Sequence, residues 1–295
     1  MPVRPFDKPP YSSSDLVQLM QSRGLVIPDA KKAERHLNVV GYYRLMGYGK
    51  YFFDSATHTF RAGTTYEDIW NIYKFDRKLR LLTLDAIERI EVAIRTAISN
   101  EMSMAHGPHW FMDDALFNTL QGRNDFCTTL RRELPSKKNE ITIQYYNKYN
   151  TPDIPPSWMV MECISMGTWL KAFRDLKQVE QKRISAALGI NNVSFTSWAN
   201  SLSWVRNVCA HHGILWNRTN ARPPRVPLAN MNYPNIAGKE ASYFATAVIA
   251  YGFLKLIVSR STWAKRLAAL MAEYPTVNSA AMGFTPGWDK DPFWK

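Results

Sequence analysis

The residues with the clearest chemical potential lie together near position 206 of the 295-residue chain. Arg206, Asn207 and His211 bring a guanidinium group, an amide and an imidazole into one short segment. A guanidinium group can hold a phosphate through paired hydrogen bonds, an amide can orient it, and an imidazole can transfer protons near neutral pH. Because RNA carries its own nucleophile, the 2′-hydroxyl group, these three side chains suit the cleavage of an RNA phosphodiester bond.

A helix that we expect over residues 194–216 determines how these groups lie relative to one another. Its apolar stripe includes His212, whereas Asn207 and His211 share a second, polar stripe. We therefore expect His212 to be a packed, hydrogen-bonded histidine of the core, and His211 to be the better candidate for chemistry, although the sequence does not decide which of the two is the acid–base group. Arg206 and His211 are separated by about 140° on a straight helix, so they reach one atom only if the helix bends or if two copies of the chain meet at a symmetry axis.

Spacing alone leaves a second interpretation open, because Arg206 and His211 could equally be solvated or capping residues near a helix end. No other catalytic or cofactor motif competes with them. The sequence contains no HExxH motif, no Cys/His quartet, no Walker-type phosphate loop, no GxGxxG and no GxSxG. We therefore expect neither a metal ion nor a cofactor.

The composition favours a polyanionic partner and a reducing compartment. Lys and Arg total 37 against 25 Asp and Glu, which gives a formal net charge of +12, although many basic proteins bind no nucleic acid. The three cysteines, Cys127, Cys163 and Cys209, form no CxxC pair and leave an odd thiol in any disulfide scheme. Neither a signal peptide nor a membrane-spanning segment is evident, so we expect a cytoplasmic protein that does not enter a membrane.

Helical periodicity dominates the chain, and strand-like alternation is almost absent, so we expect an all-α fold. A small helical N-terminal module is expected over residues 1–62 and a larger helical domain over residues 63–295. Three segments rich in Gly, Pro or Asn should be irregular: residues 41–49, 135–156 and 219–235. Helices are expected over residues 12–24, 30–37, 65–104 (with a capping box of Thr64 and Glu67), 157–173, 180–188, 194–216, 240–258 and 263–273.

One acidic residue falls on the apolar face of the long helix expected over residues 65–104. Glu91 lies four residues after Ile87 and three residues before Ile94, within a stripe of isoleucines. A carboxylate that points into the core is costly unless a cation or hydrogen-bond donors satisfy it. Glu91 should therefore have a partner.

The segment from Arg206 to Arg218, with the sequence RNVCAHHGILWNR, closely resembles the signature of Abi-like proteins, the abortive-infection bacteriophage-resistance family. In that family the R-x4-6-H motif of the HEPN superfamily is embedded in this string. Further resemblances occur in the family's order over almost the whole chain: residues 41–45, 75–80, 88–96, 156–158 with Glu162 and Gly167, and 292–294. Several motifs in one order are far more specific than any one of them.

The resemblance implies an all-helical HEPN core and a homodimer that assembles the site. It further implies an endoribonuclease that leaves 2′,3′-cyclic phosphate ends, with Arg206 and His211 as the catalytic pair. The biological role implied is defence against phage through cleavage of host or phage RNA. Some relatives are linked with a small non-coding RNA.

The polar residue that accompanies the catalytic pair on an earlier HEPN helix corresponds here to Glu91, with Arg95 one turn away. Arg95 at i+4, or Arg206 across the bundle, could supply the cation that Glu91 needs. A purely structural ion pair would explain the same residues.

Two groups of residues could contact RNA outside the catalytic pair. Aromatic faces and guanidinium groups stack on unpaired bases, although aromatic residues more often serve helix packing. The candidates are Tyr42, Tyr43 and Arg44 in one group, and Trp216, Asn217 and Arg218 beside the motif in the other.

Two functions other than a nuclease fit the same sequence. One is a non-catalytic RNA-binding protein on a HEPN scaffold, and the other is a protein–protein adaptor encoded in a defence operon. A binder would show a steep salt dependence of RNA affinity without cleavage, whereas an adaptor would show neither.

Overall fold

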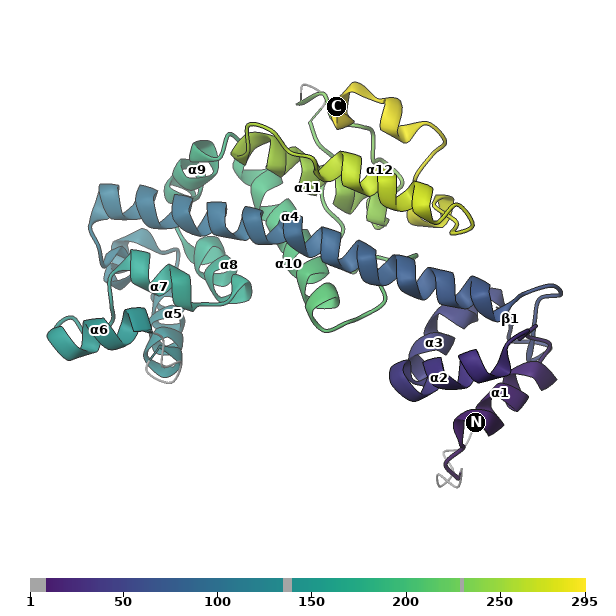
Figure 1. Cartoon of the computed structure of the whole chain (residues 1–295). Coiled ribbons are helices and arrows are strands. Elements are labelled where there is room, and N and C mark those ends of the chain that lie inside the picture. The colour runs from purple at the N-terminus through teal and green to yellow at the C-terminus, as the bar shows by residue number, and fades with distance from the viewer. Residues whose placement is uncertain (1–8, 135–139, 229–230) are drawn as a thin grey trace. The chain divides into compact units, whose positions relative to one another are not determined.

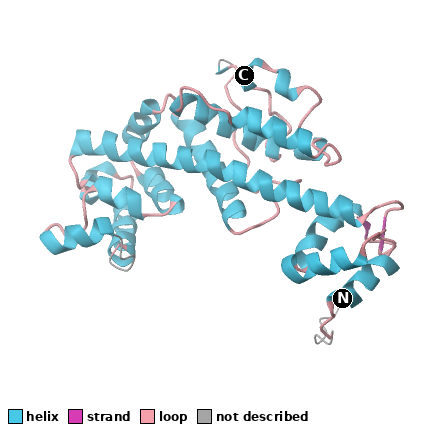
Figure 2. Ribbon diagram, in the orientation of Figure 1, coloured by secondary structure: helices cyan, strands magenta, loops and turns pink. Residues whose placement is uncertain are grey.

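A computed structural model describes residues 9–134, 140–228 and 231–295, and the regular secondary structure in these residues is almost entirely helical (Figures 1 and 2). The expected all-α fold class is therefore confirmed. The α-helices are α1 (Ser13–Ser22), α2 (Ala30–Val40), α3 (Tyr42–Gly49), α4 (Tyr66–His106), α5 (Leu120–Glu133), α6 (Glu140–Lys148), α7 (Ser157–Cys163), α8 (Met166–Asp175), α9 (Gln178–Ala187), α10 (Asn192–Ala210), α11 (Tyr243–Ile257) and α12 (Trp263–Glu273).

Short elements complete the described chain. Strands β1 (Phe53–Asp54) and β2 (Thr59–Phe60) pair antiparallel, with Phe53 opposite Phe60. Single turns of 3-10 helix lie at Lys50–Phe52, Trp110–Met112, Asp114–Leu116, Ala280–Met282, Trp288–Lys290 and Pro292–Trp294. Within the described ranges, no helix combines the length and the apolar character that crossing a bilayer requires.

The described residues form two compact units. The first contains Met1–Leu79 and Ala269–Ser279, and the second contains Arg80–Ala268 and Ala280–Lys295. The domain division expected between residues 62 and 63 stays a prediction.

In the first unit, local capping fixes the helix starts. Ser12 and Asp15 form a reciprocal capping box at the start of α1, where the sequence predicts a helix to begin. The start of α4 is capped one residue later than predicted, because Thr65 and Asp68 form the reciprocal bonds instead of Thr64 and Glu67: the Asp68 amide donates to Thr65 Oγ1 over 3.2 Å, and the Thr65 amide donates to Asp68 Oδ2 over 2.8 Å.

Helix α3 forms where the sequence predicts an irregular connection, so that prediction is wrong. Gly41, with φ of +85°, turns the chain into the helix. Leu45 and Tyr48 are fully buried, and the Tyr48 hydroxyl donates to the buried carboxylate of Asp76 over 2.7 Å. Burial of this face outweighs the low helix propensity of the glycines at 47 and 49.

Helix α4 runs without a break over 41 residues, and the long helix predicted from the sequence is confirmed. The isoleucine stripe is buried as expected, since Ile87, Ile90, Ile94 and Ile98 are at most 1% exposed. Burial of an apolar side chain of this size contributes roughly 1.5–3 kcal/mol. The stripe thus holds Glu91 against the interior of the second unit.

Two further predictions in the second unit need correction. The helix predicted over residues 157–173 is divided into α7 and α8, because Ile164 is extended and the Ser165 hydroxyl caps a new helix at the Thr168 amide. Helix α6 forms inside the segment 135–156 that was predicted to be a loop; residues 135–139 lie outside the described residues. The described part of segment 219–235 contains no α-helix or strand, as predicted.

Candidate functional site

The C-terminal end of α10 positions the candidate motif. The helix ends at Ala210, and His211 is its C-cap residue. His212 has a positive φ of +56°; its amide donates to the Cys209 carbonyl over 3.1 Å, and the Gly213 amide donates to the Val208 carbonyl over 2.7 Å. These two bonds, around a left-handed residue just beyond the cap, define a Schellman motif. The backbone of the motif is therefore closed by its own hydrogen bonds.

The two adjacent histidines differ in backbone role, although both are exposed. The prediction that His212 is a packed core histidine is wrong, because the helix stops before it and the left-handed turn takes it off the apolar stripe. His211 and Asn207 are exposed as expected for groups that contact a ligand. Trp216 is buried at 4% exposure, but from the segment after the helix instead of from the helix itself.

Glu91 is the buried charge around which the site is built. It is 8% exposed and has both of the cations that the sequence offers: Arg95 donates a hydrogen bond to Glu91 Oε1 through Nη2, and Arg206 Nε lies 3.9 Å from Glu91 Oε2. The expected pairing is confirmed. Two arginines around one carboxylate give this group of three a net charge of +1, which the exposed carboxylate of Glu88 in the same pocket offsets.

The geometry of this cluster leaves Arg206 able to bind a ligand. Its side chain is 39% exposed, against 10% for Glu91. A separation of 3.9 Å is an ion pair but is too long for a hydrogen bond, so Glu91 orients the guanidinium group without using its N–H donors. The cluster opens into a pocket of about 320 Å³ lined by Leu84, Glu88, Glu91, Val92, Arg95 and Arg206.

His211 and Asn207 do not line this pocket. Arg206 belongs to the last helical turns, whereas His211 follows the final helical residue. Within one chain, the structure therefore places the guanidinium group in the pocket and leaves the imidazole outside its lining.

A residue without a role in the sequence analysis supports the turn after His211. The buried guanidinium group of Arg80, 6% exposed, donates to the Gly213 carbonyl over 3.3 Å. Arg80 lies on α4 four helical turns before Arg95, so the helix that holds Glu91 also holds this turn. A buried arginine within a helix is itself a signal, since it must pair with an acceptor, but the acceptor is a backbone carbonyl that no side-chain pattern reveals.

Arg218 serves the same segment structurally. Its guanidinium carbon lies 5.4 Å from the centroid of the Trp204 ring, and its Nη1 donates to the Ile214 carbonyl over 3.3 Å. Asn217 is exposed with φ of +51°. RNA contact by Trp216, Asn217 and Arg218 stays a prediction.

Tyr42, Tyr43 and Arg44 lie on α3, in the first compact unit. Tyr43 is 88% exposed and Arg44 is exposed as well. These three residues therefore belong to a different compact unit from Arg206 and His211.

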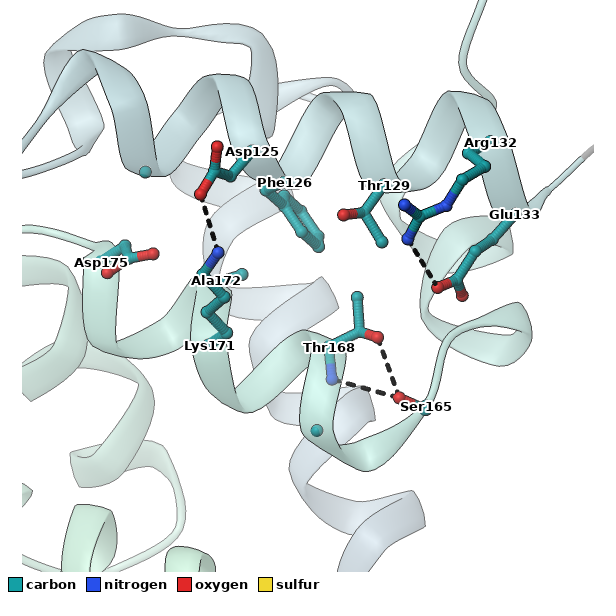
Figure 3. Close-up of a pocket in the computed structure, with 12 residues that line it drawn as sticks. Asp125, Phe126, Thr129, Arg132, Glu133, Ser165, Thr168, Lys171, Ala172 and Asp175 are labelled. Carbon is teal, nitrogen blue, oxygen red and sulfur yellow. Dashed lines mark hydrogen bonds and ion pairs between the residues drawn. The ribbon is translucent and has the colours of Figure 1, made fainter.

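A charged pocket between α5 and α8 contains none of the predicted site residues (Figure 3). Lys171 donates to Asp125 over 2.8 Å, and this bond, followed by one from Gln121, lowers the pKa of the Asp125 carboxyl below its usual range. Arg132 forms an ion pair with Glu133, with Nη2 and Oε1 3.7 Å apart. The lining carries three carboxylates, on Asp125, Glu133 and Asp175, against the two cations of Arg132 and Lys171. The surplus is one negative charge, which does not favour a phosphate.

In the part of the chain that the structure describes, no three His, Cys, Asp or Glu side chains gather closely enough to hold a metal ion. The groups at the α10 end are instead two arginines, a carboxylate, an amide and an imidazole. Such a set can bind a phosphate and move a proton.

Comparison with known families agrees with the motif at the end of α10. A family model for Abi-like proteins matches residues 35–217, which is more than half of the chain. The chain therefore belongs to the Abi-like family, whose name refers to abortive infection, a defence against phage. No curated protein and no solved structure matches the chain.

Proposed function

We propose that the chain is a metal-independent endoribonuclease of an abortive-infection system. The observation that carries this proposal is the half-exposed Arg206, which the buried carboxylate of Glu91 orients without using its donors. The exposed Asn207 and His211 follow on the same helix end. Family membership and the net charge of +12 support an RNA substrate.

The chemistry assigns one task to each group. Arg206 binds the scissile phosphate and stabilises the charge that develops on it, and Asn207 orients it. His211 accepts the proton of the 2′-hydroxyl group as its oxygen bonds to phosphorus and the bond from phosphorus to the 5′ oxygen breaks. His211 of the partner subunit, in its protonated form, gives a proton to the leaving 5′ oxygen. The products are a 2′,3′-cyclic phosphate and a 5′-hydroxyl end.

A homodimer would complete this site. One chain places Arg206 in a pocket that His211 does not line, and a second copy could bring its histidine to that pocket. Val92, which lines the pocket, and Leu81 on the same helix are 54% and 55% exposed. Exposed apolar side chains beside the pocket are what a contact between copies would bury.

The test is cleavage of an end-labelled single-stranded RNA in EDTA by the full chain. Arg206→Ala and His211→Ala should each reduce the rate by about 10²–10⁴-fold, as the loss of a proton-transfer or phosphate-binding group predicts. His212→Gly is the matched control, because it removes the neighbouring imidazole and suits the left-handed backbone. We expect wild type and the control to produce cyclic-phosphate ends, and the two alanine variants to produce far fewer. Cleavage that persists in His211→Ala, or that EDTA abolishes, would overturn the mechanism.

A non-catalytic RNA-binding protein, with a small non-coding RNA as partner, is the second candidate. The net charge of +12 favours it, because Lys and Arg contacts with phosphates supply most sequence-independent affinity. Steeply salt-dependent RNA binding without cleavage at any pH would favour this alternative. If the chain neither binds nor cleaves RNA, the result would favour an adaptor.

A further inference from the structure

The first compact unit contains an aromatic pocket of its own, of about 280 Å³. Its residues come from the end of α1, from α3, and from the β1–β2 hairpin with the turn before it. The lining consists of Arg23, Tyr42, Tyr43, Met46, Gly49, Lys50, Phe53 and Phe60. We refer to it as the aromatic pocket.

Four of the eight residues that line it are aromatic. Tyr42 and Tyr43 meet edge to face with centroids 5.7 Å apart, and Phe53 and Phe60 do the same at 5.1 Å. Gly49 allows close packing beside the rings, because a Cβ at this position would lie 3.2 Å from Met46 Sδ and 3.3 Å from Ile69 Cδ1. The pocket thus offers apolar ring surfaces from both α3 and the β1–β2 hairpin.

Tyr43 is the exposed member of this set. Its side chain is 88% exposed, whereas Phe60 is only 6% exposed. A tyrosine with so little packing contributes little to the core, and its ring remains accessible to a planar ligand. Ring stacking on such a residue is the usual way in which proteins hold unpaired bases.

The charges at the aromatic pocket have one sign. Arg23 and Lys50 are its charged residues, and the lining includes no carboxylate. Arg23 is fixed in place, since its Nη1 donates to the Tyr42 hydroxyl over 3.4 Å and its guanidinium carbon lies 5.9 Å from the Phe53 centroid. Lys50 is exposed. A ligand that suits this pocket is therefore planar and aromatic, and carries negative charge beside the ring.

We infer that the aromatic pocket binds one unpaired nucleotide of an RNA strand, with the base against the tyrosine and phenylalanine rings and its phosphate beside Arg23 and Lys50. The choice of RNA as the strand rests on the function proposed above. The pocket itself takes no part in the chemistry of Arg206 and His211. It adds a recognition site for single-stranded RNA on a unit that holds none of the catalytic candidates.

The test is the affinity of a labelled single-stranded oligoribonucleotide for the full chain carrying His211→Ala, so that the RNA stays intact. Adding Tyr43→Ala should weaken binding by about 5-fold or more, as the loss of one stacked base predicts, and Tyr43→Trp should restore it. Lys50→Gln should reduce the salt dependence by about one phosphate contact. Tyr11→Ala is the matched control, because Tyr11 is an exposed tyrosine of the same unit, 55% exposed, outside the pocket.

The outcomes separate the pocket from the nuclease. The affinity for duplex RNA should not change in Tyr43→Ala, since the bases of a duplex are already stacked on one another. An unchanged single-strand affinity, or an equal loss for the duplex, would overturn the inference. A free nucleoside monophosphate that binds as tightly as the oligomer would overturn the assignment to a strand and indicate a site for soluble nucleotides. If wild type binds through Tyr43 but cleaves no RNA, the pocket stands and the nuclease proposal fails.

Discussion

The end of α10 and the aromatic pocket, the two regions proposed to bind RNA, are built from different kinds of side chains. At the end of α10, a buried carboxylate holds two arginines and a Schellman motif fixes the backbone on which His211 stands. At the aromatic pocket, the key ring of Tyr43 is almost fully exposed. Phosphate chemistry requires groups fixed within a fraction of an ångström, whereas base stacking tolerates variation because every base has a flat face. The two regions should therefore respond differently to substitution.

Loss of the central carboxylate should give the largest change in stability. Glu91→Gln leaves Arg95 and Arg206 without their anion, and we expect the free energy of unfolding to fall by about 2–3 kcal/mol. This is less than for a fully buried pair, because the Arg206 side chain is 39% exposed. Urea unfolding of wild type and Glu91→Gln measures this loss of stability. Glu88→Gln is the control: Glu88 is exposed and lines the same pocket, so its substitution should change stability by less than about 0.5 kcal/mol. Equal effects would show that burial of Glu91 has no energetic weight.

Acid should weaken the second unit through His109. Burial, opposed by a hydrogen bond with the Ile154 backbone, lowers the pKa of His109 below its usual 6.5. The unfolded chain therefore binds the proton first, so the stability that the neutral imidazole contributes is present above pH 6.5 and is lost as pH falls through the lower folded value. Glu180 adds to this at lower pH: burial raises its pKa, but hydrogen bonds with His106 and Arg183 prevail and lower it overall.

Urea unfolding of wild type and His109→Asn between pH 7 and 5 measures this effect. In the variant, the free energy of unfolding should depend less on pH than in wild type, with a difference in slope of up to about 1.4 kcal/mol per pH unit for one proton. His58→Asn is the control, because His58 is exposed on the first unit and has a positive φ of +55°, which asparagine also adopts. Identical pH profiles for wild type and His109→Asn would contradict the prediction.

The backbone at His212 provides a smaller effect with a definite sign. Because glycine adopts a positive φ without steric cost, His212→Gly should raise the free energy of unfolding by about 1 kcal/mol, and His212→Val should lower it by about the same amount. Thermal unfolding distinguishes the two. If His212→Gly destabilised the chain, contacts of the imidazole would matter more than the backbone turn.

The smallest effect is expected at the aromatic pocket. Tyr43→Ala should change stability by no more than about 0.5 kcal/mol, because the side chain is 88% exposed. Tyr48→Phe, on the same helix, removes the donor to the buried Asp76 carboxylate and should cost about 1–3 kcal/mol. A large stability loss from Tyr43→Ala would mean that its ring supports the fold and would weaken the case for a binding surface.

The sequence predicted those parts of the molecule that local periodicity determines. The long helix α4 and the need of Glu91 for a cation follow from the 3.6-residue period alone, and the structure confirms both. The same reasoning extended the motif helix to residue 216, whereas α10 ends at Ala210. The signal for that ending was present in Gly213, which follows the last periodic residues as helix-terminating glycines do. It was outweighed by the apolar spacing of Trp216, which is buried for a different reason.

Features that depend on tertiary contacts could not be predicted in this way. Helix α3 forms despite its glycines because Leu45 and Tyr48 are buried by other elements. The aromatic pocket joins Arg23 to residues 19–37 positions away along the chain, and no spacing rule relates an arginine at the end of one helix to a hairpin. The role of Arg80 depends on a carbonyl 133 residues later in the sequence.

The turn at His212 also bears on how the motif should be recognised in other sequences. In the run His211-His212-Gly213, only the first residue is assigned to chemistry, whereas the second and third terminate the helix. A homologue with asparagine or glycine in place of His212 should keep the same backbone path and the same candidate acid–base group. A search that demands two consecutive histidines would discard such homologues. A different residue at position 212 indicates only which side chains the left-handed backbone accepts, and it does not indicate that activity is lost.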